Sequence, residues 1–365
     1  MPNRSQKEIA SIINQFIVYG DFLVAVPFGC GHVNDTFQLT FDQGGIRLHY
    51  TLQKINKNVF TEPVKVMDNV DRVTAHILRK IRETHVETRK RTLRLLRTPD
   101  NKPYVFDGNG DCWRAYVFVE HARAYEVLEN TEQAFRVAEG FGEFQKQLID
   151  LPGGRLFETI PDFHDTPKRI GQLEAAIKAD VKGRAKSVAK EIDFVMSRRD
   201  EAGLLLKLHK EGSIPERITH NDTKANNILI DDLSGNALCV LDLDTVMPGL
   251  SLYDFGDMVR SATNPADEDE VDLSKVEMRF DMYEALVKGY LQGAGDLLTA
   301  AEKEMLPFAG KLITLEIGCR FLADYLNGDT YFKIHRPDQN LDRARNQFKM
   351  VASIESQMEK MKSLI

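Results

Sequence analysis

The predicted secondary structure changes character once along this chain of 365 residues, close to residue 121. Before that position, runs of β-branched and aromatic residues alternate with short turns. Residues 22–41 predict a hairpin, residues 46–56 a third strand, and residues 102–121 a second hairpin around the turn Asp-Gly-Asn-Gly. Between them, residues 62–83 repeat valine and isoleucine at helical spacing. The first third therefore predicts a small antiparallel sheet with one helix.

After residue 121 the pattern is mainly helical. The segments with helical periodicity are 131–150, much of 168–211, 276–293, 300–327 and 337–363. We therefore expect two domains, with a small sheet domain over residues 1–121 and a larger helical domain over residues 122–365.

The composition narrows the class of protein. With 42% hydrophobic residues the chain can bury a sizeable core. The best apolar run near the start, residues 16–28, is interrupted by Gly20 and Asp21 and is too short to span a bilayer. No signal-peptide pattern precedes it, so we expect a cytoplasmic protein that does not bind membranes.

Cysteine usage and charge exclude further classes. Four scattered cysteines without a Cys-x-x-Cys pair argue against structural zinc and against a disulfide framework. A net charge of −7 argues against nucleic-acid binding, and the basic residues within 79–97 are better interpreted as a solvated face. We expect a monomer or a weak dimer.

A concentrated polar stretch, ITHNDTKANNILIDD at residues 218–232, lies between apolar segments. Its skeleton is His220-x-Asp222, with Asn227 five residues after the aspartate. Phosphoryl transfer to an alcohol needs an aspartate that meets the attacking hydroxyl and an asparagine that helps to hold Mg²⁺. The kinase catalytic loop has the same spacing. A polar loop stabilised by Asx turns is the alternative.

The next segment, ALCVLDLD at residues 237–244, predicts a strand that ends in Asp242 and Asp244. On an extended strand these two carboxylates face the same side, and we expect the metal-binding aspartate here. A later Asp-Phe-Gly matches the protein-kinase metal motif, but its Asp254 opens a helical segment instead of ending a strand. We expect Asp254 either to brace the catalytic loop through backbone hydrogen bonds or to cap its helix.

An acidic site binds a polyphosphate only with the help of a cation. Two like charges about 4 Å apart repel each other by roughly 4 kcal/mol at an effective dielectric near 20, and Mg²⁺ reverses that sign. The motif Gly29-x-Gly31 in the first hairpin could bring backbone N–H groups to the phosphates. Asn34 replaces the third glycine of a Gly-x-Gly-x-x-Gly loop, and a plain hairpin turn is the alternative.

These residues together resemble the aminoglycoside phosphotransferase and choline kinase family, and within it the N-acetylhexosamine 1-kinases. The similar segments are GHVNDTF, FHDTPKR, ITHNDTKANNIL, LDLDTVMPG, YDFGD and CRFLADYLNGDTYF, in that order over roughly residues 20–350. The resemblance implies an α+β, protein-kinase-like fold of two lobes. The N-terminal lobe would be a small antiparallel sheet that binds the nucleotide, and the larger helical lobe would bind the substrate.

The implied reaction is transfer of phosphate from ATP, with Mg²⁺, to the 1-hydroxyl of N-acetylglucosamine or N-acetylgalactosamine. Asp222 would orient that hydroxyl and accept its proton. The implied metal-binding residues are Asn227, Asp242 and Asp244. The implied sugar-binding residues are His32, Asp222, Asp242, Arg320 and Tyr331. The implied nucleotide-binding residues are Gly29, Gly31, Gln53, Phe118, Val119, Glu120 and His121.

Some of these residues have a structural alternative. Arg320 could form an ion pair with Glu316 or Asp324, one turn away on its helix. Tyr331 could belong to the core, His32 could be a surface residue, and His164 is more often a structural histidine.

One position departs from the kinase pattern. Kinases carry a lysine on the third strand for the α- and β-phosphates. Here Gln53 occupies that position, and Lys54 would reach the same face only through a bulge.

Two other functions compete with the sugar kinase. One is a kinase of another small hydroxyl compound, such as an amino alcohol or an aminoglycoside. The other is an inactive nucleotide-binding relative, which the missing lysine permits.

Overall fold

The computed structural model describes residues 4–29, 33–83 and 91–365. The chain forms two compact units. The first, the sheet unit, comprises Met1–Ala122, Leu151–Ile160 and Leu241–Val246. The second, the helical unit, comprises Arg123–Asp150, Pro161–Val240 and Met247–Ile365. The segment that contains Asp242 thus belongs to the sheet unit, although most of the chain around it belongs to the helical unit.

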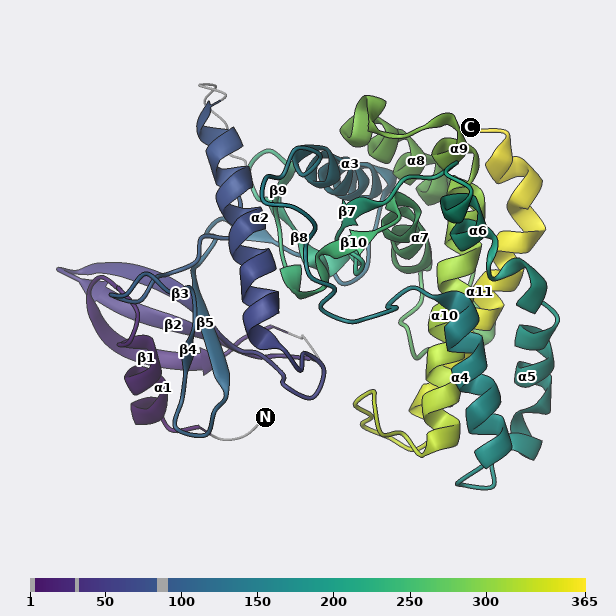
Figure 1. The fold of residues 1–365 in the computed structure, drawn as a ribbon, viewed down its shortest axis with the longest axis horizontal. Coiled ribbons are helices and arrows are strands. Elements are labelled where there is room, and N and C mark those ends of the chain that lie inside the picture. The colour runs from purple at the N-terminus through teal and green to yellow at the C-terminus, as the bar shows by residue number, and fades with distance from the viewer. Residues whose placement is uncertain (1–3, 30–32, 84–90) are drawn as a thin grey trace. The chain divides into compact units, whose positions relative to one another are not determined.

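The sheet unit contains a five-stranded antiparallel sheet in the order β1-β2-β3-β5-β4, drawn in purple and blue in Figure 1. Its strands are β1 (Asp21–Pro27), β2 (Asp35–Gln43), β3 (Ile46–Lys54), β4 (Val105–Phe106) and β5 (Cys112–Val117). Its helices are α1 (Gln6–Ile13) and α2 (Pro63–Glu83). The predicted hairpins, third strand and intervening helix are confirmed.

Helix α1 has no counterpart in the prediction. A capping box starts it, because Ser5 and Glu8 each accept a hydrogen bond from the other's backbone N–H group. Its apolar residues Ile9, Ile12 and Ile13 lie on one face and pack into the core of the sheet with Trp113. The helix is only eight residues long, so its period is a weak signal in the sequence.

The helical unit contains the remaining α-helices of the described residues. They are α3 (Thr131–Gln147), α4 (Thr166–Ala179), α5 (Ala189–Met196), α6 (Leu204–Lys210), α7 (Ser251–Ala262), α8 (Phe280–Ala294), α9 (Ala300–Glu304), α10 (Leu306–Asn327) and α11 (Gln339–Lys362). Helix α10 packs against α4, α7 and α11, and it is buried on most sides (Figure 1). The predicted mixture of an antiparallel sheet and many helices is therefore confirmed.

Glycines set the distance between α3 and α8. A Cβ atom on Gly289 or Gly293 would collide with backbone atoms of Phe135 and Glu139. The two helices can therefore approach each other closely along this seam. Their apolar side chains, with those of α7 and α10, form the largest core of the unit.

Short strands frame the polar loop predicted to be catalytic. Strands β7 (Arg217–Thr219) and β10 (Met247–Gly249) pair with each other, and β8 (Ile228–Asp231) pairs with β9 (Ala237–Val240). Strand β6 (Ala122–Arg123), at the boundary between the units, completes the sheet of β8 and β9. The residues from 220 to 227 connect β7 to β8, so both ends of the polar loop are fixed by strands.

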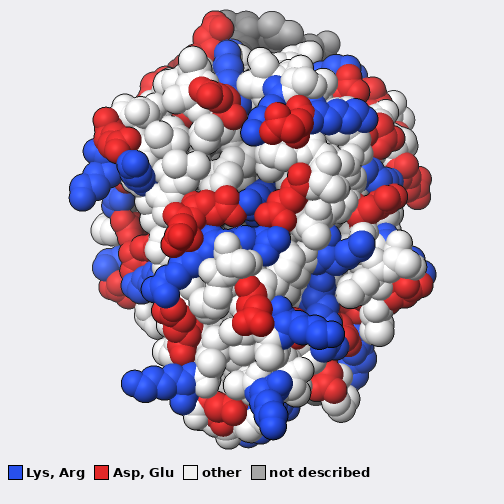
Figure 2. Space-filling view, turned by 90° about the vertical axis from the view of Figure 1, so that its right-hand side faces the viewer, with Lys and Arg blue, Asp and Glu red and all other residues white. Residues whose placement is uncertain are grey.

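Within the described part of the chain, no helix combines the length and the apolarity needed to cross a membrane. On the face of the molecule shown in Figure 2, basic and acidic side chains are interspersed, and neither sign gathers into one large patch.

Candidate active site

The loop from His220 to Asn227 is held by buried neighbours on both sides. Ile228 and Ile230 of β8 are buried in the core of the helical unit. His220 is buried too and packs edge-on against Phe141 and Phe144. Asn221 has a left-handed backbone, with φ of 65°, a conformation that asparagine tolerates better than most residues.

Asp222 and Asn227 are in direct contact. The amide nitrogen of Asn227 donates to Oδ2 of Asp222 at 2.9 Å and to its carbonyl oxygen at 2.8 Å. The spacing of five residues is therefore closed by a tight turn. Because the amide nitrogen is used in this way, the amide oxygen is the remaining polar atom of the Asn227 side chain. An oxygen donor of this kind suits a hard cation such as Mg²⁺.

Lys224 has no role in the sequence prediction, but it is the cation beside Asp222. Its Nζ lies 3.3 Å from Oδ1 of Asp222, and the two side chains are 39% and 29% exposed. Burial alone would raise the pKa of Asp222, but the charges of Lys224, His220 and Arg260 lower it. The carboxylate is therefore ionised and can accept a hydrogen bond. The signal in the sequence was a lysine two residues after the aspartate.

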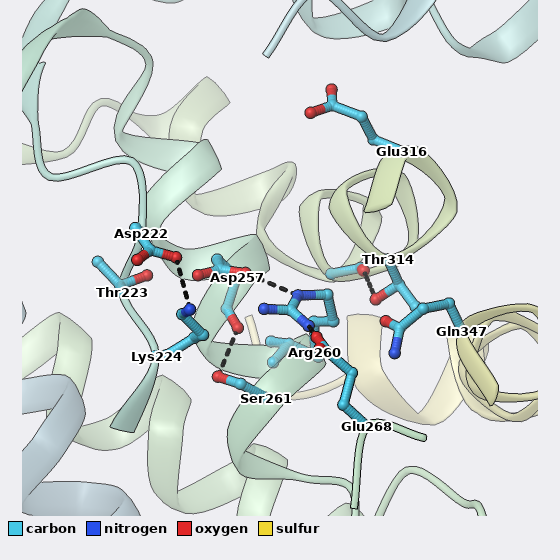
Figure 3. Close-up of polar contacts among 12 residues, drawn as sticks. Asp222, Thr223, Lys224, Asp257, Arg260, Ser261, Glu268, Thr314, Glu316 and Gln347 are labelled. Carbon is cyan, nitrogen blue, oxygen red and sulfur yellow. Dashed lines mark hydrogen bonds and ion pairs between the residues drawn. The ribbon is translucent and has the colours of Figure 1, made fainter. Parts of the chain in front are cut away.

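A buried ion pair lies near Asp222. Asp257 and Arg260 both lie on α7, and Nε of Arg260 is 2.7 Å from Oδ1 of Asp257. Nη1 of Arg260 also lies 3.0 Å from Oε1 of Glu268. Figure 3 shows this chain of contacts beside the pair of Asp222 and Lys224. Arg260 lies close enough to lower the pKa of Asp222, so it contributes to the charge balance of the loop.

Asp254 braces the loop through backbone hydrogen bonds, which is one of the two alternatives predicted for it. Its carboxylate accepts hydrogen bonds from the backbone N–H groups of His220, at 3.0 Å, and Asn221, at 2.7 Å. Gln145 and the hydroxyl of Thr223 contribute further contacts. The alternative of a helix cap is wrong, because the N-cap of α7 is Leu250 and Asp254 lies inside the first turn.

His164 fixes the loop from the opposite side. Its Nδ1 lies 2.8 Å from Oε1 of Glu316, and its Nε2 lies 3.0 Å from the carbonyl oxygen of Asn221. Thr166 donates to the other oxygen of Glu316 at 2.7 Å. The interpretation of His164 as a satisfied, buried histidine is confirmed. Because both ring nitrogens face acceptors, the doubly protonated ring fits this site best.

We expect the stability that His164 contributes to fade at high pH. Burial alone would lower the pKa of His164, but Glu316, the carbonyl of Asn221 and the more distant Asp257 raise it above its usual value. A group whose pKa is higher in the folded state contributes stability that is fully present below its unfolded pKa, near 6.5, and is lost as pH rises through the folded pKa. Urea unfolding should therefore separate wild type from His164→Gln more widely at pH 6 than at pH 9.

His335, an exposed histidine, supplies the control for this comparison. His335→Gln should leave the free energy of unfolding within about 0.5 kcal/mol of wild type at each pH. A gap between wild type and His164→Gln that stays constant from pH 6 to pH 9 would contradict a charged imidazole.

Asp242 and Asp244 do not lie on an extended strand, so the prediction that they face one side of a strand is wrong. Strand β9 ends at Val240, Asp242 has a left-handed backbone with φ of 50°, and a 3-10 turn, η4 (Leu243–Thr245), follows. The alternation of side chains in a strand ends where the strand ends. Asp244 is 1% exposed and contacts Arg114 and Asn34 within the sheet unit.

Gln53 and Lys54, the two candidates for the role of the kinase strand lysine, have different partners in the sheet. Gln53 lies opposite Arg114 in the pairing of β3 with β5 and accepts a hydrogen bond from its Nε at 3.0 Å. Lys54 instead lies 3.0 Å from Asp35. The register of β3 is unbroken along both neighbours, so the structure contains no bulge that would bring Lys54 to the face of Gln53. A cation does accompany Gln53, but it is Arg114.

The predicted nucleotide-binding residues are placed in part. Gly29 has φ of 78°, the left-handed conformation that glycine favours, whereas Gly31 and His32 lie outside the described residues. Phe118 packs edge-on against Phe28, with ring centroids 5.4 Å apart. Three more predicted residues follow it before the boundary of the unit, namely Val119, Glu120 and His121.

Arg320 faces aromatic rings and has no ion pair among the described residues. Its guanidinium lies 5.0 Å from the ring centroid of Phe163, 5.9 Å from that of Tyr331 and 5.6 Å from that of Phe332. The two predicted ion-pair partners bind elsewhere. Glu316 contacts His164, and Asp324 accepts the backbone N–H groups of residues 330–332.

Tyr331 is 55% exposed, so the interpretation of it as a core residue is wrong. A second arginine, Arg169, lies near Arg320. Burial and the charge of Arg320 lower the pKa of Arg169. Phe163 is the residue next to His164, which contacts Asn221 in the loop from His220 to Asn227. This surface of aromatic rings and arginines therefore adjoins that loop within the helical unit. We call it the arginine–aromatic surface, made of Phe163, Arg169, Arg320, Tyr331 and Phe332.

The antiparallel sheet and the many helices match the fold of small-molecule phosphotransferases, and the family comparison defines the class. Residues 27–303 match the model of the phosphotransferase enzyme family, APH. Because the match covers more than half of the chain, this protein belongs to that family.

Solved structures agree with this assignment in fold. The chain is similar to a microcompartment-associated aminopropanol kinase, with 14% identity and a TM-score of 0.59 over 98% of this chain and 99% of that one. It is also similar to spectinomycin phosphotransferase APH(9)-Ia in complex with ADP and spectinomycin, with 12% identity and a TM-score of 0.54 over 99% and 100%. For choline kinase LicA from Streptococcus pneumoniae the identity is 12% and the TM-score 0.52, over 95% and 97%.

Proposed function

We propose that this protein transfers the γ-phosphoryl group of ATP to the anomeric 1-hydroxyl of an N-acetylhexosamine, which yields the sugar 1-phosphate. The family membership supports phosphoryl transfer to a small molecule. The complex of the similar spectinomycin phosphotransferase with ADP supports an adenine nucleotide as the donor. The segments that resemble N-acetylhexosamine 1-kinases support the sugar acceptor.

The observation that carries the choice of acceptor is the arginine–aromatic surface. Arg320 and Arg169 lie close to each other, and no carboxylate forms an ion pair with Arg320 among the described residues. Such a surface repels an ammonium group, whereas it can donate hydrogen bonds to the oxygens of a neutral sugar and its acetamido carbonyl. Aromatic side chains beside it suit the apolar face of a sugar ring.

Amino alcohols are the second candidate class, because solved structures of similar fold include an aminopropanol kinase and a choline kinase. Such acceptors are cations, and cations need acidic or aromatic surroundings. The aromatic rings of the arginine–aromatic surface are already in contact with Arg320, so a second cation there would meet like charge. This observation favours the neutral acceptor.

Asp222 is the proposed catalytic residue. Its ionised carboxylate can accept a hydrogen bond from the sugar hydroxyl and so point an oxygen lone pair of that hydroxyl at the phosphorus. A carboxylate with a lowered pKa is a weak base, so positioning contributes more than early removal of the proton, which passes to Asp222 late. Lys224 holds the carboxylate of Asp222 in its ionised form and places a positive charge beside it.

Asn227 and Asp242, with Asp244 as a further candidate, are the proposed ligands of Mg²⁺. The amide oxygen of Asn227 fits this role, because the amide nitrogen is used by Asp222. When bound, Mg²⁺ supplies charge neutralisation for the phosphates beside these carboxylates. We propose that Gly29 and Gly31, Gln53 and the segment from Phe118 to His121 contact the nucleotide, and that His32 joins Arg320 and Tyr331 in sugar binding.

The function can be tested by measuring ATP consumption with purified protein. The acceptors are N-acetylglucosamine, N-acetylgalactosamine, choline, ethanolamine and 1-amino-2-propanol, and phosphorus NMR identifies each product. We expect turnover with an N-acetylhexosamine and the signal of a glycosyl 1-phosphate. A larger kcat/KM for an amino alcohol would overturn the sugar assignment, and a lack of turnover with bound Mg·ADP would favour an inactive relative.

Arg320→Gln should reduce kcat/KM for the sugar by about 10- to 100-fold. A hydrogen bond that involves a charged donor contributes about 1.5–3 kcal/mol, which corresponds to this range. The loss should fall mainly on KM, because the contact is made in the ground state as well as the transition state. Initial-rate measurements over a range of sugar concentrations give both parameters.

Arg199, whose side chain is 58% exposed, provides the matched control. Arg199→Gln removes the same charge from the helical unit and should change both parameters by less than about twofold. An unchanged KM for the sugar in Arg320→Gln would remove Arg320 from the binding site.

A further inference from the structure

We propose that Arg114 is a positioning residue that supplies, from β5, the fixed positive charge that kinases place as a lysine on the third strand. It holds the segment Leu241–Val246 through Asp244, so that Asp242 keeps the backbone conformation needed to bind Mg²⁺. This inference rests on the proposed function of the sheet unit and deepens it. It also changes the role proposed for Asp244 from a metal ligand to a positioning residue.

Arg114 is placed by the alternation of β5. The neighbours of Arg114 in the strand, Trp113 and Ala115, point into the core that contains α1. Arg114 therefore points to the opposite face, where its Nη1 lies 4.0 Å from the sulfur of Met67 on α2. Arg114 is 0% exposed. A charge at such a depth is stable only with a close partner of the opposite sign.

That partner is Asp244, whose Oδ1 accepts a hydrogen bond from Nη1 of Arg114. The Nε of Arg114 donates at 3.0 Å to Gln53, the residue at the position of the kinase lysine. The guanidinium thus joins β3, β5 and the segment that contains Asp242. An arginine side chain keeps its positive charge in proteins, and Asp244 supplies the opposite charge beside it.

The second oxygen of Asp244 is also used. Asn34 donates to Oδ2 of Asp244 at 2.8 Å, and its own amide oxygen accepts the backbone N–H group of Asn56 at 3.0 Å. Asn34 is the residue that replaces the third glycine of the Gly-x-Gly-x-x-Gly pattern. The structure therefore accounts for this departure, because an asparagine here connects the start of β2 to Asp244 and a glycine could not.

These contacts explain why two aspartates stand two residues apart. Both oxygens of Asp244 bind partners inside the sheet unit, whereas Asp242 lies on the turn between β9 and η4 with a left-handed backbone. A left-handed aspartate is unfavourable by itself and needs neighbours that hold it. Asp244 and Arg114 hold the residues directly after it. Supporting contacts of this kind typically change metal affinity by about 10- to 100-fold.

The inference can be tested by calorimetric titration of ADP, with and without Mg²⁺, and by thermal unfolding of the free protein. In Arg114→Met we expect the affinity for ADP in the presence of Mg²⁺ to fall by about 10- to 100-fold. The affinity for ADP without metal should fall much less, because only the contact with Gln53 belongs to the proposed nucleotide site, whereas the pair with Asp244 supports the metal ligand. Arg114→Lys, which keeps the charge but cannot reach both Gln53 and Asp244, should give an intermediate loss.

A second variant separates position from stability. Arg114→Met alone leaves the buried carboxylate of Asp244 without a positive charge beside it and lowers the unfolding temperature. The double variant Arg114→Met with Asp244→Leu leaves no unpaired charge, so much of the lost unfolding temperature should be recovered. The double variant should nevertheless keep the loss of Mg²⁺-dependent affinity. Arg97→Met, which removes an arginine that bonds Asp71 at 2.8 Å elsewhere in the sheet unit, is the matched control and should keep wild-type affinity.

The outcomes separate a failure of the proposed function from a failure of the positioning role of Arg114. If wild type fails to bind ADP with Mg²⁺, the proposed function is wrong. If wild type binds and the double variant binds equally well, the positioning role of Arg114 is overturned while the proposed function stands. An equal loss in Arg97→Met would likewise overturn it, because general loosening of the unit would then explain the effect.

Discussion

Asp222→Asn should reduce kcat for the sugar by about 10²- to 10⁴-fold, the range that a positioned acid or base usually contributes. The amide is close in shape to the carboxylate, and it can still contact Asn227, which lies 2.9 Å away. What it loses is the negative charge that attracts the hydroxyl hydrogen and the capacity to take the proton. The fold and the binding of Mg·ADP should therefore persist, and single-turnover kinetics with a saturating sugar would measure the chemical step directly.

Asp232 provides the control for this substitution. It lies in the turn between β8 and β9, is exposed, and forms an ion pair with Arg123. Asp232→Asn removes one carboxylate from the same unit and should leave kcat within about twofold of wild type. A value of kcat near that of wild type in Asp222→Asn would show that another group meets the hydroxyl, and the catalytic assignment would be wrong.

The elements of the fold were predictable because their signals are local. Apolar residues at helical spacing in α2 and β-branched runs on both sides of short turns are visible within ten or twenty residues. The Asp222 loop was predictable for a related reason. Its chemistry is compressed into eight residues, and short apolar strands flank it.

The contacts that set the conformation of Asp242 were not predictable from local pattern. The sequence Leu-Asp-Leu-Asp continues the alternation of a strand, yet the strand ends at Val240. The turn is fixed by Arg114, which lies 130 residues earlier in the chain, and by Asn34, 210 residues earlier. Long-range pairs between buried polar groups leave no periodic trace, so a sequence pattern cannot show them.

Long-range contacts also explain why the predicted ion pair of Arg320 on α10 does not form. Arg320 has acidic residues one turn before and one turn after it, and spacing alone favours an ion pair on the helix. In the structure each of these acidic residues binds a group from elsewhere in the chain. Glu316 contacts His164, and Asp324 accepts backbone N–H groups of the residues after α10. The contacts that form in three dimensions therefore leave Arg320 without a carboxylate partner among the described residues.

Asp254→Asn should cause a large loss of stability. Asp254 is 0% exposed, and each of its two oxygens accepts a backbone N–H group of the catalytic loop. In either orientation of an asparagine side chain, its NH₂ group would face one of those N–H groups. A buried donor left without an acceptor costs about 1–3 kcal/mol, and at least two donors are affected. We expect a loss of about 2–5 kcal/mol, or roughly 3–7 °C in the unfolding temperature of a chain of this length, measured by calorimetry.

Two control variants test whether this loss of stability comes from the hydrogen bonds between Asp254 and the backbone of the loop. Asp281 also lies in the first turn of a helix, α8, but is exposed, so Asp281→Asn should shift the unfolding temperature by no more than about 2 °C. Asp242→Asn should show the converse of Asp254→Asn, with little change in stability and weaker binding of ADP when Mg²⁺ is present. If Asp254→Asn instead left stability intact and removed the effect of Mg²⁺ on ADP binding, Asp254 and not Asp242 would be the metal ligand. The literal Asp-Phe-Gly would then carry the role that it has in protein kinases, and the turn after β9 would have a structural role alone.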